Sequence, residues 1–330
     1  MKLASPLFHG PQHALHAGIV EMGAYEALWD RPGASFKRVH EWIAGAASGR
    51  AGDLVPAETA EAYAQTISHR LAEASLDDVG VKLFGEAGYP PRLGDARHPL
   101  QAMYYRGRWD LVHTRSVAVV GARQISAQGA ARTRKLVRHL VEDGFTIVSG
   151  LAAGVDGIAH RTAIEMGGQT IAVLGTPITN VYPRPHAALQ REIGDRFLVI
   201  SQVPMILYAK RDHRHNRGFF PERNITMSAL TDASIIVAIG QSNGTFIQSK
   251  AALDQVSAIL GAEQSGIRVY AFDPGDMRTA MHQEAFPGED ISDRAEPETV
   301  VPSLIHLVET APPSGRYRAS HLSVASGVSS

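Results

Sequence analysis

The sequence predicts an α/β protein with a mainly parallel sheet, preceded by a helical N-terminal region. From residue 116 onward, short apolar runs alternate with amphipathic helical patterns. The apolar runs are continuous, which is typical of strands covered by helices on both faces. Glycine-rich stretches follow several of these runs, as expected for tight strand-to-helix turns. Joined by right-handed crossovers, these units give a Rossmann-like sheet.

The helical N-terminal region spans residues 1–78. Apolar side chains recur there at intervals of three and four residues, which is the spacing of one helix face. Three stretches show this spacing: residues 15–28, 36–43 and 59–74. A connector rich in Ala, Gly, Ser and Pro occupies residues 46–56. Packing is the simplest role for all three stripes.

Residues 79–115 form a lead-in to the sheet. Short strands are predicted at 81–84 and 103–105, on either side of the structure-breaking sequence GYPPRL. We expect a domain boundary near residue 110.

The predicted Rossmann-like domain spans residues 116–275. Its predicted strands are 117–120, 145–148, 170–174, 197–200, 234–239 and 268–272. Its predicted helices are 126–142, 156–166, 185–193, 224–231 and 246–261. We expect residues 265–275 to close the sheet as a parallel strand beside 234–239.

The C-terminal part has a different composition. Residues 276–311 form an irregular, acidic extension that ends in a predicted helix at 297–310. Residues 312–330 are rich in Ser, Pro and Gly, which predicts a flexible tail.

Composition limits the possible functions. The 330 residues include 32 Lys+Arg and 33 Asp+Glu, a formal net charge of 32 − 33 = −1, so any nucleic-acid binding needs a local patch. The absence of cysteine excludes disulfides, thiolate metal sites, iron–sulfur clusters and cysteine nucleophiles. No apolar run approaches the roughly 18–20 residues of a membrane span, and the start lacks a signal-peptide pattern. We expect a soluble, cytoplasmic protein without a membrane partner.

Glycine-rich loops occur at four predicted strand or helix ends. In a doubly wound sheet, ligands bind beyond the carboxyl ends of the strands, and small residues let backbone N–H groups approach phosphate oxygens. The loops are Gly121-Ala122-Arg123, the stretch 149–154 that begins Ser149-Gly150, Gly175-Thr176-Pro177, and 240–245 with Asn243-Gly244-Thr245. Together they favour a phosphate-bearing ligand, although ordinary tight turns also explain them.

No cofactor, metal or catalytic site is expected. The loop after the first strand matches neither the G-x-G-x-x-G dinucleotide pattern nor a Walker A loop. Ser149, Asp156 and His160 could form a nucleophilic triad, but Asp156 is better explained as a helix cap. His213 and His215 could bind a metal, but they have no third ligand at a suitable spacing.

A local basic segment, Lys210–Arg223, is the strongest binding signal. Its sequence KRDHRHNRGFFPER has five Lys and Arg against two acids, with Phe219 and Phe220 among them. Cations for phosphates beside aromatic faces for bases suit sequence-tolerant binding of single strands. The alternative is a solvated loop with two buried phenylalanines.

Several ordered motifs resemble the DNA-processing protein A family (DprA/Smf). The matching stretches are SVAVVGAR, SGLAAGVDGIAH, GGQTIAVLGTPITNVYP, FFPERN and GTFIQSKAALDQ, preceded by the lead-in GEAGYPPRL and MYYRG. The resemblance covers about residues 80–260.

The resemblance implies a non-enzymatic protein that binds single-stranded DNA during transformation, loads the RecA recombinase onto it and forms a homodimer. Carried over by position, the family's DNA-binding residues fall on Arg123, Arg217, Phe220, Arg223, Asn224, Asn243, Gly244 and Thr245. Four positions depart from the family pattern: Ala153, Pro177, Gln202 and Ile225. Ala153 and Ile225 stand where the family has basic residues, so the DNA-binding surface is depleted of charge.

A second resemblance, over residues 249–318, is to the C-terminal part of short-chain dehydrogenases, which would make the chain a hybrid. The Tyr-x-x-x-Lys pair of that family would fall on Phe246 and Lys250, and phenylalanine has no hydroxyl to relay a proton. We therefore expect no NAD(P)-dependent hydride transfer. Another alternative is a nucleotide-derivative sensor or hydrolase of the wider Rossmann superfamily.

Overall fold

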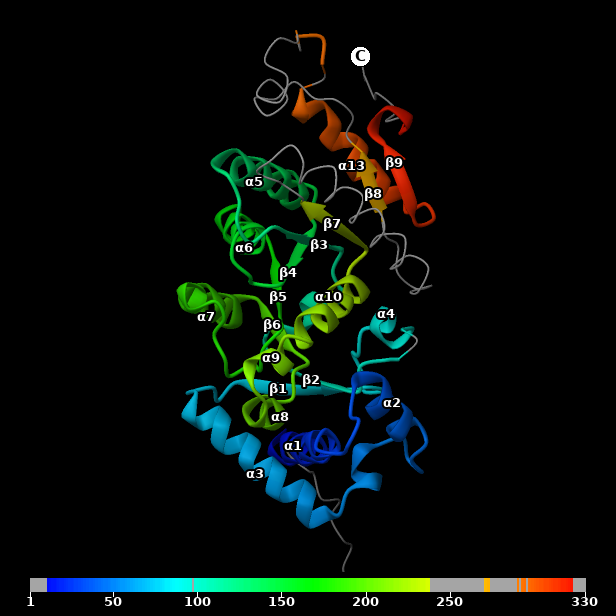
Figure 1. Ribbon diagram of the computed structural model, residues 1–330, viewed down its shortest axis with the longest axis vertical. Coiled ribbons are helices and arrows are strands. Elements are labelled where there is room, and N and C mark those ends of the chain that lie inside the picture. The colour runs from blue at the N-terminus through cyan, green and yellow to red at the C-terminus, as the bar shows by residue number, and fades with distance from the viewer. Residues whose placement is uncertain are drawn as a thin grey trace, which may run out of the picture. The chain divides into compact units, whose positions relative to one another are not determined.

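The computed structural model describes residues 11–96, 98–237, 270–273, 290, 292–294 and 296–322. Several predictions fall outside the described residues, including the helix at 246–261, Phe246 and Lys250, and the Asn243-Gly244-Thr245 loop. The chain divides into two compact units (Figure 1). The first unit contains residues 1–110 and 172–226, and the second contains 111–171 and 227–330. The domain limits predicted from the sequence stay predictions.

Seven strands form a mixed sheet in the order β1-β2-β6-β5-β4-β3-β7. They are β1 (Val79–Leu83), β2 (Ala102–Gly107), β3 (Ser116–Gly121), β4 (Thr146–Ser149), β5 (Thr170–Leu174), β6 (Leu198–Ser201) and β7 (Ala233–Val237). In the second unit, β3 pairs in parallel with both β4 and β7. In the first unit, β2 pairs antiparallel with β1 and β6. The predicted α/β, Rossmann-like class is confirmed, with two antiparallel strands added at one edge.

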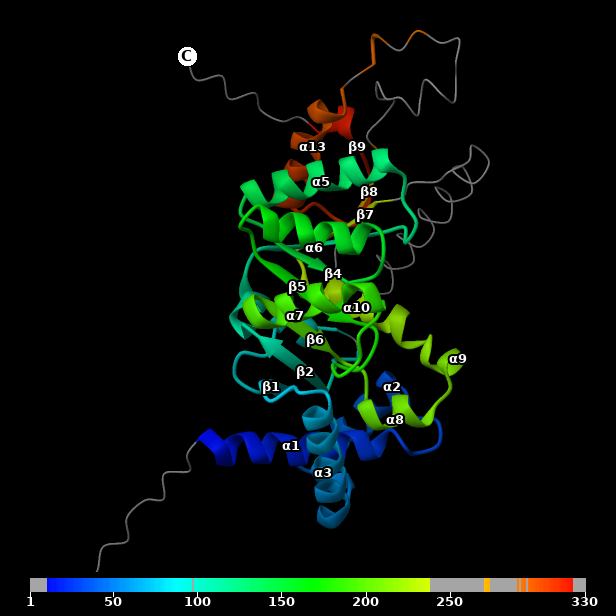
Figure 2. The same ribbon diagram turned by 90° about the vertical axis from the view of Figure 1, so that its left-hand side faces the viewer.

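Helices cover the strands within each unit. They are α5 (Ala127–Glu142), α6 (Val155–Glu165), α7 (Ala187–Arg196) and α10 (Phe219–Leu230). Figure 2 shows α5 and α6 side by side in front of β4, and α6 also contacts β3. In Figure 1, α7 lies on one side of β6 and α10 on the other. Continuous apolar strands are buried by this covering: every residue of β5 and of β6 is buried.

Three helices form the N-terminal part of the first unit. They are α1 (Pro11–Leu28), α2 (Phe36–Ala44) and α3 (Ala57–Glu73). The Ser35 side chain accepts a hydrogen bond from the Arg38 amide at 3.2 Å and so caps α2. The backbones of α1 and α3 approach closely at Gly23, where an added Cβ would lie 2.2 Å from the Ala60 carbonyl oxygen. Their apolar faces share one core with β1, β2 and α8 (Met205–Lys210).

The short helices α8 and α9 (His213–Asn216) were not predicted. Helix α10 begins five residues before its predicted start. The remaining short helical turns are α4 (Pro91–Gly94), η1 (Ala51–Leu54), η2 (Trp109–His113) and η3 (Arg184–His186). The basic segment is therefore mostly helical, whereas the alternative considered for it was a solvated loop. Among the described residues, no helix is both long and apolar enough to cross a membrane.

The C-terminal strands require a correction. Residues 270–273 form a strand, β8 (Tyr270–Asp273), but it pairs in parallel with β9 (Gly315–Arg318) in a separate two-stranded sheet. The prediction that this strand joins the main sheet beside β7 is therefore wrong for the residues described. The tail predicted to be flexible from residue 312 contains β9, followed by η5 (Ala319–His321); η4 (Pro297–Val300) and α13 (Val301–Thr310) precede it.

Side-chain contacts explain this pairing. The rings of Tyr270 and Tyr317 pack edge-on with centroids 5.7 Å apart, and the Tyr270 hydroxyl donates to the Pro312 carbonyl oxygen at 2.8 Å. Composition indicated a polar tail, whereas Tyr317 and Leu322 of this tail pack against the core of the second unit.

Candidate nucleic-acid interface

An aromatic pair lies beyond the carboxyl end of β5 in the first unit. Phe220 is half-buried and packs on Gly175, where an added Cβ would lie 2.6 Å from the Phe220 ring. The Tyr182 ring meets the Phe220 ring edge-on, with centroids 5.7 Å apart. Tyr182 is 46% exposed, so the pair presents an aromatic surface to solvent. The absence of a side chain at Gly175 thus allows Phe220 to lie against this loop.

Arg223 and Asn224 hold α10 to the same strand end. Arg223 is only 5% exposed, and its Nη1 donates to the Val173 carbonyl oxygen at 2.9 Å. Its Nε donates to Asn224 Oδ1 at 2.9 Å. Arg223 therefore links α10 to β5. Its predicted contact with phosphate remains a prediction.

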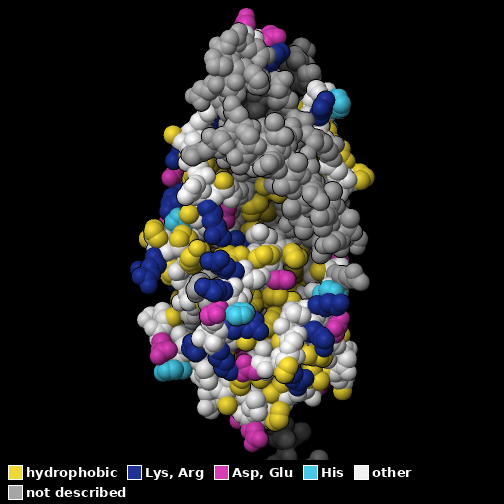
Figure 3. Space-filling model, viewed as in Figure 1, with side chains coloured by type: hydrophobic (Ala, Val, Ile, Leu, Met, Phe, Trp, Pro, Cys, Tyr) yellow, Lys and Arg dark blue, Asp and Glu magenta, His cyan; other side chains and the backbone are white. Residues whose placement is uncertain are grey.

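The basic segment carries exposed cations on short helices. Arg217 is exposed in the turn between α9 and α10. The Asp212 carboxylate caps α9 by accepting from the His215 and Arg214 amides at 3.0 and 2.8 Å. Those hydrogen bonds, that from His215 foremost, lower the pKa of Asp212. Lys210, by contrast, is bound by Asp30. On the face drawn in Figure 3, Lys and Arg side chains are interspersed with hydrophobic ones.

In the second unit, the loop after β3 meets the start of α6. The Val155 amide donates to the Ala122 carbonyl oxygen at 3.1 Å. Gly154 has φ +77°, and a Cβ there would lie 2.2 Å from that same oxygen. A Cβ at Gly121 would lie 2.3 Å from the Val237 carbonyl oxygen. These glycines permit the close approach that places Arg123, which is exposed, at the end of β3.

Ser149 and Gly150, at the end of β4, are buried. The Ser149 hydroxyl donates to the Val119 carbonyl oxygen at 2.6 Å, so it links β4 to β3. His160 Nδ1 lies 2.7 Å from Thr170 Oγ1. Gly154 is the N-cap of α6, and Asp156 accepts from the Ala152 amide at 3.3 Å, so the expectation that Asp156 caps this helix is wrong.

His215, on α9, lies beside the acid that caps this helix. His215 Nδ1 lies 2.9 Å from Asp212 Oδ1. Over the described part of the chain, no group of three or more His, Cys, Asp or Glu side chains is placed to hold a metal ion.

The departures from the family pattern have structural settings. Gln202 is buried, and its Oε1 accepts a hydrogen bond from the Thr226 hydroxyl, which links the end of β6 to α10. Pro177 is buried in the Gly175 loop, whereas Ala153 and Ile225 are half-buried. The first two substitutions are therefore internal, and the last two leave small or apolar side chains at the partly exposed positions.

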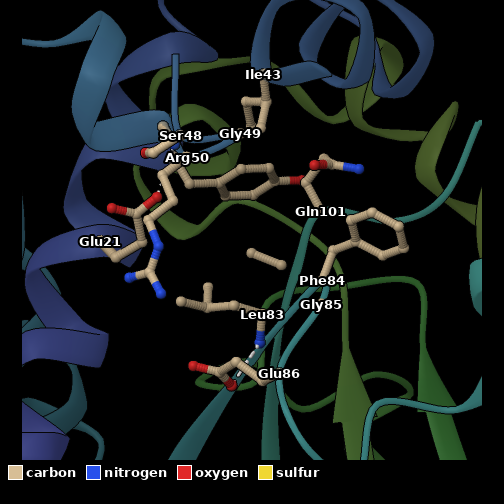
Figure 4. Close-up of a pocket in the computed structure, with 13 residues that line it drawn as sticks. Glu21, Ile43, Ser48, Gly49, Arg50, Leu83, Phe84, Gly85, Glu86 and Gln101 are labelled. Carbon is tan, nitrogen blue, oxygen red and sulfur yellow. Dashed lines mark hydrogen bonds between the residues drawn. The ribbon is translucent and has the colours of Figure 1, made fainter. Parts of the chain in front are cut away.

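A separate pocket of about 270 Å³ lies in the first unit between the N-terminal helices and β1 (Figure 4). Glu21, Arg50, Phe84 and Gln101 are among its lining residues. The Glu21 carboxylate accepts from the Ala51 amide at 2.6 Å, which holds the loop at one side. None of the predicted DNA-binding residues lines this pocket.

Two features of the interface were missed from the sequence. Tyr182 belongs to a quoted motif, but nothing in the pattern singled it out as an exposed partner of Phe220. Glu222, half-buried on α10, was counted only as a negative charge, and burial raises the pKa of its carboxyl.

A Rossmann-like sheet with exposed arginines and aromatic rings beyond its strand ends defines a candidate binding protein for nucleic acid or nucleotides. The model of the family DNA recombination-mediator protein A matches residues 81–275. The chain belongs to this family, and the resemblance to DNA-processing protein A is confirmed.

Relatives include Protein Smf of Synechocystis sp., 36% identical over 166 residues, which are 49% of this chain and 40% of the relative. DNA processing protein DprA of Streptococcus pneumoniae is 35% identical over 182 residues, 54% of this chain and 62% of the relative. The chain thus spans 40% and 62% of the lengths of these two relatives.

Two solved structures are similar in part. DprA from Streptococcus pneumoniae gives a TM-score of 0.48 at 25% identity, covering 83% of this chain and 89% of that one. The second is DprA from Helicobacter pylori, whose structure concerns its single-stranded DNA binding mode. It gives a TM-score of 0.46 at 23% identity, and the match covers 68% of this chain and 95% of that one.

Proposed function

We propose that this protein binds single-stranded DNA through Arg217 and the Tyr182–Phe220 ring pair. The contact between the exposed Tyr182 ring and the half-buried Phe220 ring, next to the exposed Arg217, is the observation that carries the proposal. Bases stack on aromatic faces whatever their identity, and guanidinium groups neutralise the phosphates between them. Arg123 in the second unit is a further proposed phosphate contact.

Membership of the family supports finer proposals about the process. We propose that the protein acts in the cytoplasm in DNA processing and transformation, as a homodimer that loads a RecA-type recombinase onto the strand. Binding and handover of DNA require no bond to be made or broken, so no catalytic residue is assigned.

Replacing Arg217 with alanine should weaken binding to oligo(dT) and lower the slope of log K against log salt by about 0.7, one phosphate contact on a single strand. Titration at several salt concentrations measures both. Arg38→Ala, which removes an exposed arginine from α2, is the matched control and should leave the slope unchanged. Equal slopes for Arg217→Ala and the wild type would remove Arg217 from the interface.

Replacing Phe220 with alanine should weaken binding by about 1–3 kcal/mol, the contribution of one stacked base. The loss should be similar for oligo(dT) and oligo(dA), since stacking does not depend on base identity. Phe84→Ala removes an exposed ring that lies at the separate pocket, and it serves as the control. A loss confined to one base sequence would contradict a stacking role.

A nucleotide-derived ligand is the second candidate. Ala153 and Ile225 leave the predicted DNA-binding positions with fewer cations than the family pattern, which favours a ligand with few phosphates over a long strand. Thermal shift with mono- and dinucleotides, compared with oligo(dT), separates the two. Stabilisation by a nucleotide without any effect of oligo(dT) would favour this second function.

A further inference from the structure

The basic segment and α8, the helix that leads into it, are joined to the N-terminal helices of the same unit by three contacts. Sequence reasoning treated these helices as packing alone. In both Figure 1 and Figure 2, α8 lies beside α1. The contacts fall at the start of α8, at its end, and at the start of α10.

The first contact is a buried carboxylate at the start of α8. Glu26, on α1, is 1% exposed. Its Oε1 accepts from the Met205 amide at 2.8 Å, and its Oε2 accepts from the Ile206 amide at 2.7 Å. The adjoining Pro204 provides no side-chain cap, so a residue far away in the sequence caps this helix. Tyr104 on β2 donates its hydroxyl to Glu26 Oε1 at 2.5 Å.

The second contact is at the end of α8. The Asp30 carboxylate, just after α1, accepts hydrogen bonds from Lys210 and from the Tyr63 hydroxyl of α3. Burial alone would raise the pKa of Asp30, but these hydrogen bonds outweigh it and lower the pKa. Lys210 is therefore committed to a contact within the protein, unlike Arg217.

The third contact is an aromatic cage around Phe219. Its ring centroid lies 6.3 Å from Trp29, 6.2 Å from Phe36 and 6.2 Å from Tyr208. Asn216 Nδ2 donates to the Tyr208 carbonyl oxygen at 2.9 Å, which joins α9 to α8. Arg217 and Phe220 thus adjoin residues that are held by the protein interior.

We propose that Glu26 is a positioning residue that, with Asp30 and the Phe219 cage, holds the basic segment in its DNA-binding arrangement. This inference rests on the proposed function. A segment with several cations repels itself when compact, and ordering it during binding would reduce affinity. Fixing it beforehand from α1 and α3 removes that cost, so the N-terminal helices act on DNA binding without contacting DNA.

Replacing Glu26 with glutamine tests this positioning role. The amide keeps one acceptor oxygen for the Met205 amide but places an NH2 group opposite the Ile206 amide, so one of the two capping hydrogen bonds of α8 is lost. We expect backbone amides of residues 208–217 to exchange hydrogen about tenfold faster, as loss of a capping hydrogen bond implies. Oligo(dT) affinity should fall about three- to tenfold, because the competent arrangement is populated less.

Tyr104→Phe is the matched control. It removes one hydrogen bond from the same buried carboxylate but leaves both α8 contacts intact. Exchange in residues 208–217 and oligo(dT) affinity should both stay within about twofold of the wild type. Equal effects of the two variants, or unchanged exchange in Glu26→Gln, would overturn the proposal.

Should Glu26→Gln fail to fold, Asp30→Ala releases the other end of α8 from a more exposed position and should accelerate exchange near residue 210. Unchanged exchange there would contradict the proposal. The proposed DNA binding and the positioning role of Glu26 can fail separately. If the wild type does not bind oligo(dT), the proposed function is wrong. Hydrogen exchange still decides whether Glu26 fixes the segment.

Discussion

Replacing Phe219 with alanine should lower the free energy of unfolding by about 3–5 kcal/mol, the usual cost of removing a large buried aromatic side chain. Phe219 is 5% exposed, and three rings surround it. The cavity left behind has rigid aromatic walls that cannot collapse easily, which favours the upper part of that range. Urea denaturation followed by far-UV circular dichroism measures the change.

The neighbouring Phe220→Ala variant is the control for this prediction. Phe220 is half-buried and gains part of its contacts from the exposed Tyr182, so its loss should cost clearly less stability. Its effect should instead fall on DNA binding. Equal destabilisation by the two variants would contradict the division between an anchoring ring and a binding ring.

Replacing Gly154 with alanine should cost about 3 kcal/mol or more of stability, the second large effect expected. Its φ of +77° and ψ of −126° disfavour any L side chain, and the new Cβ would lie 2.2 Å from the Ala122 carbonyl oxygen. Relief requires the loop that carries Arg123 to move away from α6. Thermal and urea unfolding measure the loss.

Gly167→Ala separates the cost of the left-handed backbone from the cost of the close contact with the Ala122 carbonyl oxygen. Gly167 has φ +71°, but a Cβ there would meet nothing within 4 Å. It should therefore cost only about 1–2 kcal/mol, the penalty of a left-handed backbone. If both alanine variants lost the same stability, close approach of the Arg123 loop to α6 would not be what requires glycine at 154.

The main sheet was predictable because its signals are local. Continuous apolar runs such as Val117–Val120 mark strands covered on both faces, and glycines mark the turns between them. The short helices α8 and α9 were not predictable in this way. A six-residue helix has little stability of its own, and α8 is capped by Glu26, which no nearby pattern reveals.

The pairing partner of a strand and the burial of a side chain were also not predictable from the sequence. A strand at 268–272 was correctly expected, but the apolar pattern does not state which edge it joins, and Tyr317 lay in a segment of polar composition. Arg217 and Phe220 were found because they adjoin in one basic segment. Arg223 looked equivalent to Arg217 in that segment, and only the fold shows that it faces Val173.

Strand β1 lies at one edge of the sheet, with β2 as its hydrogen-bonded neighbour in the described strand order. Open strand edges invite pairing with other chains and hence aggregation. This edge is only five residues long, and Lys82 within it reaches the Ala87 carbonyl oxygen at 3.1 Å. The Tyr105 ring covers Gly80, where a Cβ would lie 2.4 Å from it. We therefore expect that molecules at high local concentration do not associate through β1. The strand offers few backbone groups with which a strand of another molecule could pair.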